Sequence, residues 1–280
     1  MSDAMSPNGS RIALVLGGGG PVGISWLTGV AVGLREAGID LALADRFVGT
    51  SAGAIVGTVL AAGGDPMSLL AEPPADAAPI EADPAKLAEI FSVMFTPGVD
   101  AMDARRRIGE LALAAEAGDP AVHIARIGTM VGIAEWPERE LVLTAVDART
   151  GELRAWERGG AATLEQALAS TTCVPGVFPP IPIAGNDYID GGVRSSINAD
   201  LALPADIVVI VEPLAHIFPR TPADRELGSA REISIIPDTA AIAAFGNDLF
   251  GRAALHPAFE AGVRQAADAA PLLKDVWPTR

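Results

Sequence analysis

The sequence predicts an α/β fold: a three-layer α/β/α sandwich in which a mostly parallel central sheet lies between helices. Short apolar segments alternate with segments of helical length along the chain. Two of the apolar segments run directly into glycine-rich loops, which is typical of buried strands in a parallel sheet. One further pair is separated by a glycine-bearing turn and predicts a β-hairpin.

The first unit of this fold is a strand, a glycine loop and a helix. Arg11–Leu16 is short, apolar and rich in residues that favour strands, and it stops at the run Gly17–Gly20. Apolar residues continue at helical length over Val22–Ala37, and Gly38 follows where a helix end is expected. The uncharged stretch 12–34 is long enough to span a bilayer, but its glycine run would leave backbone groups unsatisfied in lipid. We therefore expect a strand, a loop and a buried helix.

The same order is repeated in the next segment and continues more loosely afterwards. Residues 45–48 predict a strand, 49–53 a glycine-flanked turn, and 54–62 a helix. Residues 72–84 are rich in Pro, Ala and acidic residues and predict a loop. The remaining expected elements are helices at 85–95, 101–117 and 164–170, a hairpin at 140–147 and 152–156, strands at 188–189, 206–211 and 233–236, and a helical C-terminal region. Residues 72–120 are interpreted either as a cover over a site or as an ordinary packing layer.

Length and composition predict one folded domain. Half of the 280 residues are hydrophobic and a fifth are charged, so we expect a flexible tail at 1–10 and a single domain over 11–280. A formal net charge of -15 argues against nucleic-acid binding, and the run Arg105–Arg107 is expected to be a solvated helix face. Cys173 is the single cysteine and is expected to be buried. Because no disulfide or signal-peptide pattern is present, we expect a cytoplasmic protein.

The strongest functional motif is Gly-x-Ser-x-Gly, formed by Gly49, Thr50, Ser51, Ala52 and Gly53. It lies between an apolar strand and a helix, where a nucleophile elbow must lie. The turn lifts the serine hydroxyl out of the backbone, and the helix that follows adds partial positive charge near it. A chance Gly-Ser turn is the alternative interpretation, and the flanking strand and helix argue against it. We predict that Ser51 is a nucleophile.

A second motif follows the first strand. Gly18, Gly20 and Gly23 fit the G-x-G-x-x-G pattern, which alone predicts dinucleotide binding. That interpretation expects an acidic residue at the end of the second strand, whereas Asp45 opens that strand. Beside a serine elbow, the loop is better explained as an oxyanion hole made by the backbone N–H groups of Gly18, Gly19 and Gly20.

A third motif places an acidic residue at a strand end, followed by two glycines. These residues are Asp190, Gly191 and Gly192. Alone they predict only a tight turn, because Asp-Gly turns are common. Together with Ser51, they make Asp190 a possible general base.

The three motifs together resemble the patatin-like phospholipase family. The stretch 169–180 is also similar to the segment that precedes the family's aspartate, so the resemblance runs from about Arg11 to Val211. The resemblance implies a Ser51–Asp190 dyad that hydrolyses carboxylic esters of lipids. The implied partner is a lipid or other acyl ester, with transient contact to a membrane surface. The resemblance implies no metal or other cofactor. The family's loop usually carries Arg or Lys just before its last glycine, whereas this chain has Pro21-Val22. That difference leaves the oxyanion to backbone donors.

Two alternatives stay open. The chain order also permits an α/β-hydrolase triad of Ser51, Asp190 and either His216 or His256. That fold places several strands before its elbow, whereas only two expected strands precede Ser51. The other alternative is a nucleotide-binding or regulatory protein that uses the glycine loop and leaves Ser51 without a role.

Overall fold

The computed structural model describes residues 9–71, 84–115 and 117–278. The expected tail at 1–10 and loop at 72–84 therefore lie almost wholly outside the described residues. The described strands are β1 (Ile12–Leu16), β2 (Arg46–Gly49), β3 (Glu140–Asp147), β4 (Leu153–Trp156), β5 (Ile181–Ile183), β6 (Asn186–Asp190), β7 (Ile207–Val211) and β8 (Arg231–Ile235). The described α-helices are α1 (Gly20–Glu36), α2 (Ala52–Ala61), α3 (Pro84–Met94), α4 (Ala101–Ala114), α5 (Pro120–Val131), α6 (Leu164–Thr172), α7 (Thr239–Phe245) and α8 (Leu255–Leu273).

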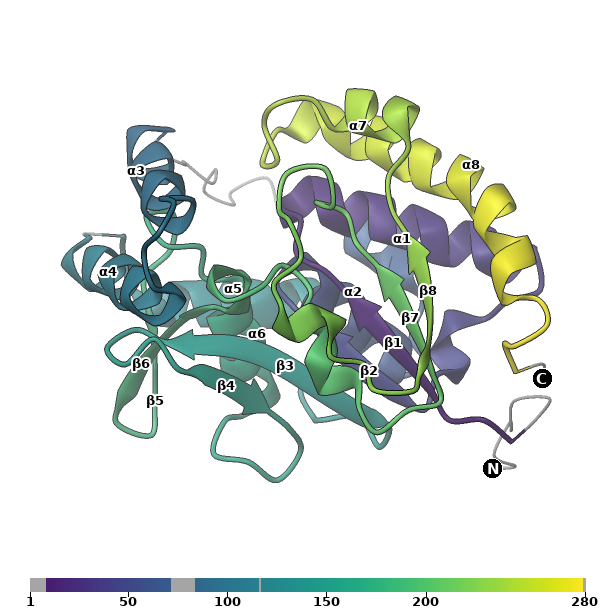
Figure 1. The fold of residues 1–280 in the computed structure, drawn as a ribbon, viewed down its shortest axis with the longest axis horizontal. Coiled ribbons are helices and arrows are strands. Elements are labelled where there is room, and N and C mark those ends of the chain that lie inside the picture. Colours follow the sequence, from purple (N-terminus) through teal and green to yellow (C-terminus); the bar gives the residue numbers. More distant parts are fainter. Residues whose placement is uncertain (1–8, 72–83, 116, 279–280) are drawn as a thin grey trace.

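The strands form one mixed sheet whose centre is parallel (Figure 1). Its order is β5-β6-β3-β2-β1-β7-β8, and β4 pairs with β3 outside this path. Neighbouring strands from β3 to β8 in this order are parallel. β4 and β6 run antiparallel to β3, and β5 runs antiparallel to β6. The predicted mostly parallel sheet and the predicted hairpin are both confirmed.

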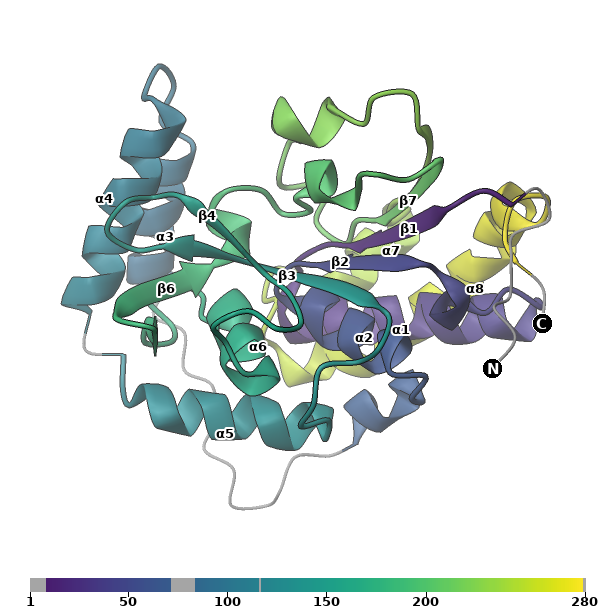
Figure 2. The same cartoon turned by 90° about the horizontal axis from the view of Figure 1, so that it is seen from below.

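Alternate residues of β1 show how the sheet is covered on both faces. Ile12, Leu14 and Leu16 pack into a core that includes residues of α1, α2, α6 and α8. The intervening Ala13 and Val15 face a second core, to which the segment after β6 contributes. Two short 3₁₀ helices lie near this core: η4 (Ala199–Ala202) between β6 and β7, and η5 (Ala223–Arg225) between β7 and β8. Figure 2 shows α1, α2 and α6 on one side of the sheet and the segments that contain these short helices on the other. The fold is therefore a three-layer α/β/α sandwich.

Strand register brings the three predicted motifs to one edge of the sheet. Leu16 at the end of β1 pairs with Gly49 at the end of β2, so the loops that follow leave the sheet side by side. In the antiparallel pair of β3 and β6, Ala145 lies opposite Asp190. Gly49 lies opposite Leu143, so the end of β2 and the end of β6 meet beside neighbouring positions of β3.

The sequence did not predict α5 or β5, and several boundaries differ: α4, for example, ends at Ala114 rather than at residue 117. No element was expected at Asp119 and Pro120, but they begin α5: the Asp119 side chain accepts a hydrogen bond from the Ala121 N–H, and Pro120 occupies the first helical turn. β5 lies in a stretch interpreted only as proline-rich. α1 begins at Gly20 rather than at Val22, because Pro21 is suited to a first turn.

The uncharged stretch 12–34 forms β1, the glycine loop and most of α1, as expected. None of the helices in the described part of the chain has the length and apolar character that a membrane crossing requires.

Candidate active site

Ser51 occupies a strained turn between β2 and α2. Its backbone has φ 52° and ψ -117°, a left-handed conformation that a residue with a side chain seldom adopts. The surrounding chain holds this turn in place: the Ser51 N–H donates to Thr171 Oγ1 at 3.0 Å. Ser51 is only 7 % exposed, so its hydroxyl lies in a nearly closed site. The predicted nucleophile thus has the backbone geometry of an elbow.

The glycines of the elbow are required by close packing. A Cβ on Gly53 would lie 1.9 Å from the carbonyl oxygen of Leu16, and one on Gly49 would lie 2.5 Å from Ala54 Cα. Both distances are far shorter than any real contact, so β1 and α2 approach each other only because these residues lack side chains. The helix α2 is therefore pressed against the strand that leads into the glycine loop.

Asp190 closes β6 and is buried beside Ser51. Its Oδ1 accepts a hydrogen bond of 2.7 Å from the Gly192 N–H, and its side chain is almost fully buried. Burial raises the pKa of the Asp190 carboxyl to about 7, and hydrogen bonds from the Gly192 amide and the Ser51 hydroxyl partly oppose this rise. The predicted pair therefore lies together.

The second oxygen of this carboxyl group is the one left to accept a proton. Asp190 Oδ2 is buried and has no hydrogen bond of regular geometry with any described residue, although the Ser51 hydroxyl is close enough to lower the pKa of Asp190. Catalytic hydrogen bonds are often poorly aligned without substrate and become aligned when it binds. The arrangement suits a carboxylate that takes the serine proton.

The glycine loop runs beside the nucleophile. A Cβ on Gly18 would lie 3.5 Å from Ser51 Cβ. The Gly18 N–H, however, donates to the Ser196 carbonyl at 2.8 Å. The N–H groups of Gly19 and Gly20 have no hydrogen-bond partner among the described residues, and Gly20 is the first residue of α1. Of the predicted oxyanion donors, the last two are therefore available in this structure.

The thiol of Cys173 lies near the carboxyl group of Asp190. Burial, and then the nearby charge of Asp190, raise the pKa of Cys173 well above its ordinary value, so the group stays a thiol. Its Sγ donates to the carbonyl oxygens of Ser170 at 3.1 Å and Tyr188 at 3.3 Å. The expectation that Cys173 is a buried structural residue is confirmed.

The two histidines of the alternative triad have other surroundings. The His256 ring pairs with Glu260 at 3.2 Å, and its side chain is 78 % exposed. His216 is exposed, and its ring lies 6.1 Å from that of Phe245. Among the described residues, neither ring forms a hydrogen bond with Ser51 or Asp190. The geometry favours the dyad over the triad.

A third histidine, His123 of α5, lies closer to the elbow. Its ring stacks on Phe178 with 4.1 Å between centroids, and its Nε2 lies 3.1 Å from Thr172 Oγ1. Burial lowers the pKa of His123 to about 4, with the charge of Arg126 acting in the same direction. The ring is therefore neutral at physiological pH, and it contacts Thr172, the residue that follows Thr171.

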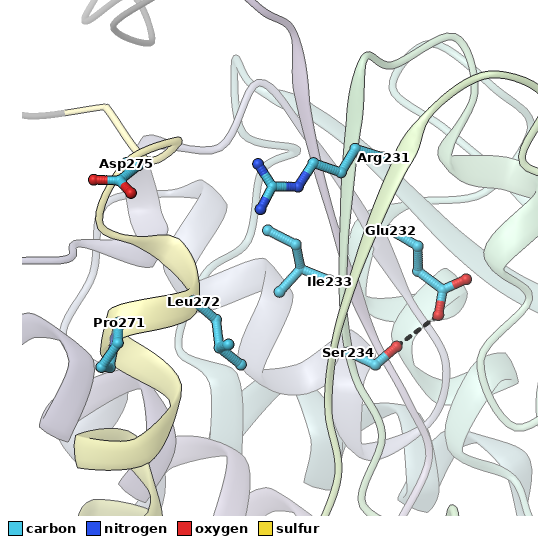
Figure 3. A pocket seen from close by; sticks show the side chains of 7 residues that line it. All are labelled: Arg231, Glu232, Ile233, Ser234, Pro271, Leu272 and Asp275. Atoms are coloured by element: carbon cyan, nitrogen blue, oxygen red, sulfur yellow. Dashed lines mark hydrogen bonds between the residues drawn. The ribbon is translucent and has the colours of Figure 1, made fainter.

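Two other features bear on alternative sites. Asp45 Oδ2 accepts a hydrogen bond of 2.7 Å from the Ile12 N–H, so this acidic residue supports the start of β1. A surface hollow of about 400 Å³ between β8 and α8 is lined by Arg231, Glu232, Ile233, Ser234, Pro271, Leu272 and Asp275 (Figure 3). It includes none of the residues of the three motifs. We therefore place the chemistry at Ser51 rather than in this hollow.

Sequence reasoning missed the polar side chains that support the elbow and the base. Thr171 holds the Ser51 backbone, while Thr50, Thr144 and Asn198 form a buried hydrogen-bonded group beneath it. The side chains of these three supporting residues are fully buried. Their roles depend on contacts between distant segments, and no local sequence pattern predicts these roles.

Comparison with known proteins gives a family match and similar solved structures. The sequence model of the family described as patatin-like phospholipase matches residues 14–203. Among solved structures, the chain is similar to VipD from Legionella pneumophila, with 13 % identity and a TM-score of 0.43 over 93 % of this chain and 67 % of VipD. It is also similar to the type III effector ExoU, with 16 % identity and a TM-score of 0.39 over 94 % of this chain and 53 % of ExoU.

No curated protein matches the sequence. The family match covers more than half of the chain and contains the glycine loop, the elbow and the Asp-Gly-Gly turn. This chain belongs to the patatin-like phospholipase family.

Proposed function

We propose that this protein is a serine acyl hydrolase that cleaves carboxylic esters of lipids with a Ser51–Asp190 dyad. Family membership supports a lipid acyl hydrolase. The observation that carries the finer proposal is the buried Asp190, whose pKa of about 7 suits a base, beside Ser51 in a strained elbow. A carboxyl group with an ordinary pKa would be a much weaker base for a hydroxyl group.

In the acylation step, the Asp190 carboxylate takes the proton of the Ser51 hydroxyl through Oδ2. The Ser51 oxygen attacks the carbonyl carbon of the ester, and the carbonyl oxygen becomes an oxyanion. When the tetrahedral intermediate collapses, the bond to the leaving alcohol breaks and Asp190 returns its proton to that alcohol. In the second step a water molecule gives a proton to Asp190 and attacks the acyl carbon. When this second tetrahedral intermediate collapses, the bond to the Ser51 oxygen breaks, Asp190 returns the proton to that oxygen, and the acid leaves.

Backbone amides are the proposed oxyanion donors. Gly19 and Gly20 have N–H groups without other partners, and they lie at the start of α1, whose dipole places partial positive charge there. Gly18 borders Ser51 and was predicted as a third donor, but its N–H is engaged by Ser196. We therefore assign the main role to Gly19 and Gly20.

The substrate enters from a surface that carries exposed aromatic residues. Phe91 and Phe95 of α3 are 37 % and 44 % exposed, and both rings contact Phe218 of the segment after β7 at centroid distances of 5.9 and 5.5 Å. We call these three residues the aromatic cluster. Pro213 of the same segment lies against Gly19, so the cluster is connected to the oxyanion loop.

Such a cluster suits transient contact with a membrane surface. Exposed apolar patches mark interaction sites, and aromatic rings favour the boundary between lipid and water. The net charge of -15 opposes binding to anionic lipid, so we propose contact with zwitterionic or neutral lipid surfaces. The absence of a basic residue at Pro21-Val22 agrees with substrates that lack an anionic head group.

Hydrolysis of p-nitrophenyl esters of increasing acyl length, followed by phospholipids, tests the proposal. The wild type should hydrolyse at least one series, and Ser51→Ala should not. A double variant of His216→Ala and His256→Ala should retain most of the activity. Loss of activity in the double histidine variant would support the triad, and equal rates for wild type and Ser51→Ala would refute the hydrolase.

A further inference from the structure

The segment 195–198, which follows the Asp-Gly-Gly turn, contacts all three loops of the candidate active site. The carbonyl oxygen of Ser196 accepts the hydrogen bond from Gly18. The side chain of Ile197 packs against Gly17, where an added Cβ would lie 3.0 Å from Ile197 Cγ2. The remaining two loops are both contacted by the side chain of Asn198.

Asn198 joins the nucleophile loop to the base loop through one amide group. Its Nδ2 lies 2.8 Å from the Ser195 carbonyl oxygen, 3.0 Å from Thr50 Oγ1 and 3.3 Å from the Gly191 carbonyl oxygen, and its two protons are shared among these acceptors. Thr50 directly precedes Ser51, and Gly191 directly follows Asp190. Because the residue is fully buried, no water competes for these hydrogen bonds.

The partners of Asn198 fix the orientation of its amide. Arg194 has only donors, and its Nη1 lies 2.8 Å from Asn198 Oδ1, so the NH₂ group must face Thr50 and Gly191. Thr144 Oγ1 lies 2.9 Å from Thr50 Oγ1 and donates to the Gly49 carbonyl at 3.4 Å. Hydrogen bonds are therefore donated in one direction along this group: Asn198 donates to Thr50, Thr50 donates to Thr144, and Thr144 donates to the carbonyl oxygen of Gly49.

Asn198 is itself held firmly. Its backbone lies in the left-handed region at φ 51°, which Asn tolerates better than most residues. Its N–H donates to Ser195 Oγ at 2.9 Å, and that hydroxyl donates to the buried Asp224 at 2.8 Å. Arg194, which orients the amide, forms two hydrogen bonds with Asp200. The amide group is therefore fixed relative to the sheet.

We propose that Asn198 is a positioning residue that sets the distance between Ser51 and Asp190 by holding Thr50 and Gly191 at the same time. The inference rests on the proposed acyl hydrolase function. The two catalytic side chains come from strands that do not pair with each other, since β2 and β6 each pair with β3. A direct link between their loops therefore governs their alignment.

The variant Asn198→Asp tests this role with little change of shape. It replaces the NH₂ donor with a carboxylate oxygen that faces acceptors, and it adds negative charge near Asp190. For p-nitrophenyl butyrate we expect kcat to fall about 100-fold, because small misplacements cost this much, while KM changes less than about threefold. The midpoint of the pH–rate profile should rise, because a like charge raises the pKa of a carboxyl group. Asn186→Asp makes the same change at an exposed position of β6 and should alter none of these values.

The results separate this inference from the proposed function. If the wild type is active and a folded Asn198→Asp variant keeps the wild-type kcat and pH midpoint, the positioning role is refuted while the hydrolase stands. If the wild type is no faster than Ser51→Ala, the function fails and this inference fails with it. If Asn198→Asp does not fold, Thr50→Val and Thr50→Ser decide. Loss of kcat in the Val variant with retention in the Ser variant supports the role, and equal kcat in both refutes it.

Discussion

Ser51 follows β2 and Asp190 ends β6, and the two residues meet because β2 and β6 pair with adjacent stretches of β3. The parallel register of β1 and β2 places the elbow beside the glycine loop, and the antiparallel return of β6 brings the carboxyl group to the same edge. Burial then raises the pKa of Asp190 to about 7. The fold thus supplies both the position and the basicity of the proposed base.

The role of Asp190 as base predicts a pH dependence of ester hydrolysis. The carboxyl group must be unprotonated to accept the serine proton, so kcat/KM should rise with pH and reach half of its maximum near pH 7. Asp190→Asn should fold and lose about 100- to 10,000-fold in kcat, because an amide cannot take the proton. A pH–rate profile of p-nitrophenyl butyrate hydrolysis measures both effects. A midpoint near the ordinary carboxyl value of 3.8 would contradict the assignment.

The same raised pKa predicts a cost in stability. Between pH 3.8 and about 7, the folded protein keeps a proton on Asp190 that the unfolded chain has lost. Because the folded state binds this proton more tightly than the unfolded chain does, the free energy of unfolding decreases as the pH rises through that window. Relative to Asp190→Asn, the wild type should lose on the order of 4 kcal/mol of unfolding free energy between pH 4 and pH 8. Urea unfolding of both proteins across this range measures the difference, and parallel curves would refute it.

Close packing at the elbow predicts different effects for two glycines of α2. Gly53→Ala would place a Cβ 1.9 Å from the Leu16 carbonyl oxygen. We therefore expect the free energy of unfolding to fall by about 3 kcal/mol, the upper end of the usual range for overpacking. Gly57→Ala is the matched control, since its Cβ would meet only Leu16 Cδ1 at 3.3 Å. The control should change stability by less than about 1 kcal/mol. Equal thermal melting of both variants would contradict the packing described here.

The aromatic cluster predicts that its loss slows hydrolysis of lipid in vesicles but not hydrolysis of a soluble ester. Phe91→Ser with Phe95→Ser should lower hydrolysis of lipid in zwitterionic vesicles about tenfold, through the loss of apolar contact area, while leaving a soluble short-chain ester unaffected. Val122→Ser is the control, because Val122 is 60 % exposed on α5 and lies outside the cluster. Vesicle sedimentation measures binding directly. Unchanged binding of the double variant would exclude the cluster as the membrane contact.

Local sequence patterns predicted the parts of the fold that depend on neighbouring residues. The apolar strands β1, β2 and β7, the hairpin of β3 and β4, and the Gly-x-Ser-x-Gly turn each carry their pattern within a few residues. α5 was missed because a proline more often interrupts a helix than begins one, although Asp119-Pro120 is a favourable helix start. β5 was missed because Pro182 is tolerated only on an edge strand, and a strand's place in the sheet is a property of the whole fold.

Local sequence patterns did not predict the buried polar residues that support the site. Asn198 contacts Thr50 through a hydrogen bond between distant segments, and its importance follows from burial that only the folded chain creates. The engagement of the Gly18 N–H by Ser196 is of the same kind. Sequence therefore indicates the candidate catalytic residues, whereas the structure is needed to show which residues contact and position them.

Labelling with a fluorophosphonate probe tests the central claim most directly, because the probe reacts with an activated serine whatever the natural substrate is. Peptide mass spectrometry of the labelled wild type should place the adduct on Ser51, with no adduct in Ser51→Ala and much slower labelling in Asp190→Asn. Labelling of the wild type that is no faster than that of Ser51→Ala, or an adduct on another residue, would contradict the account.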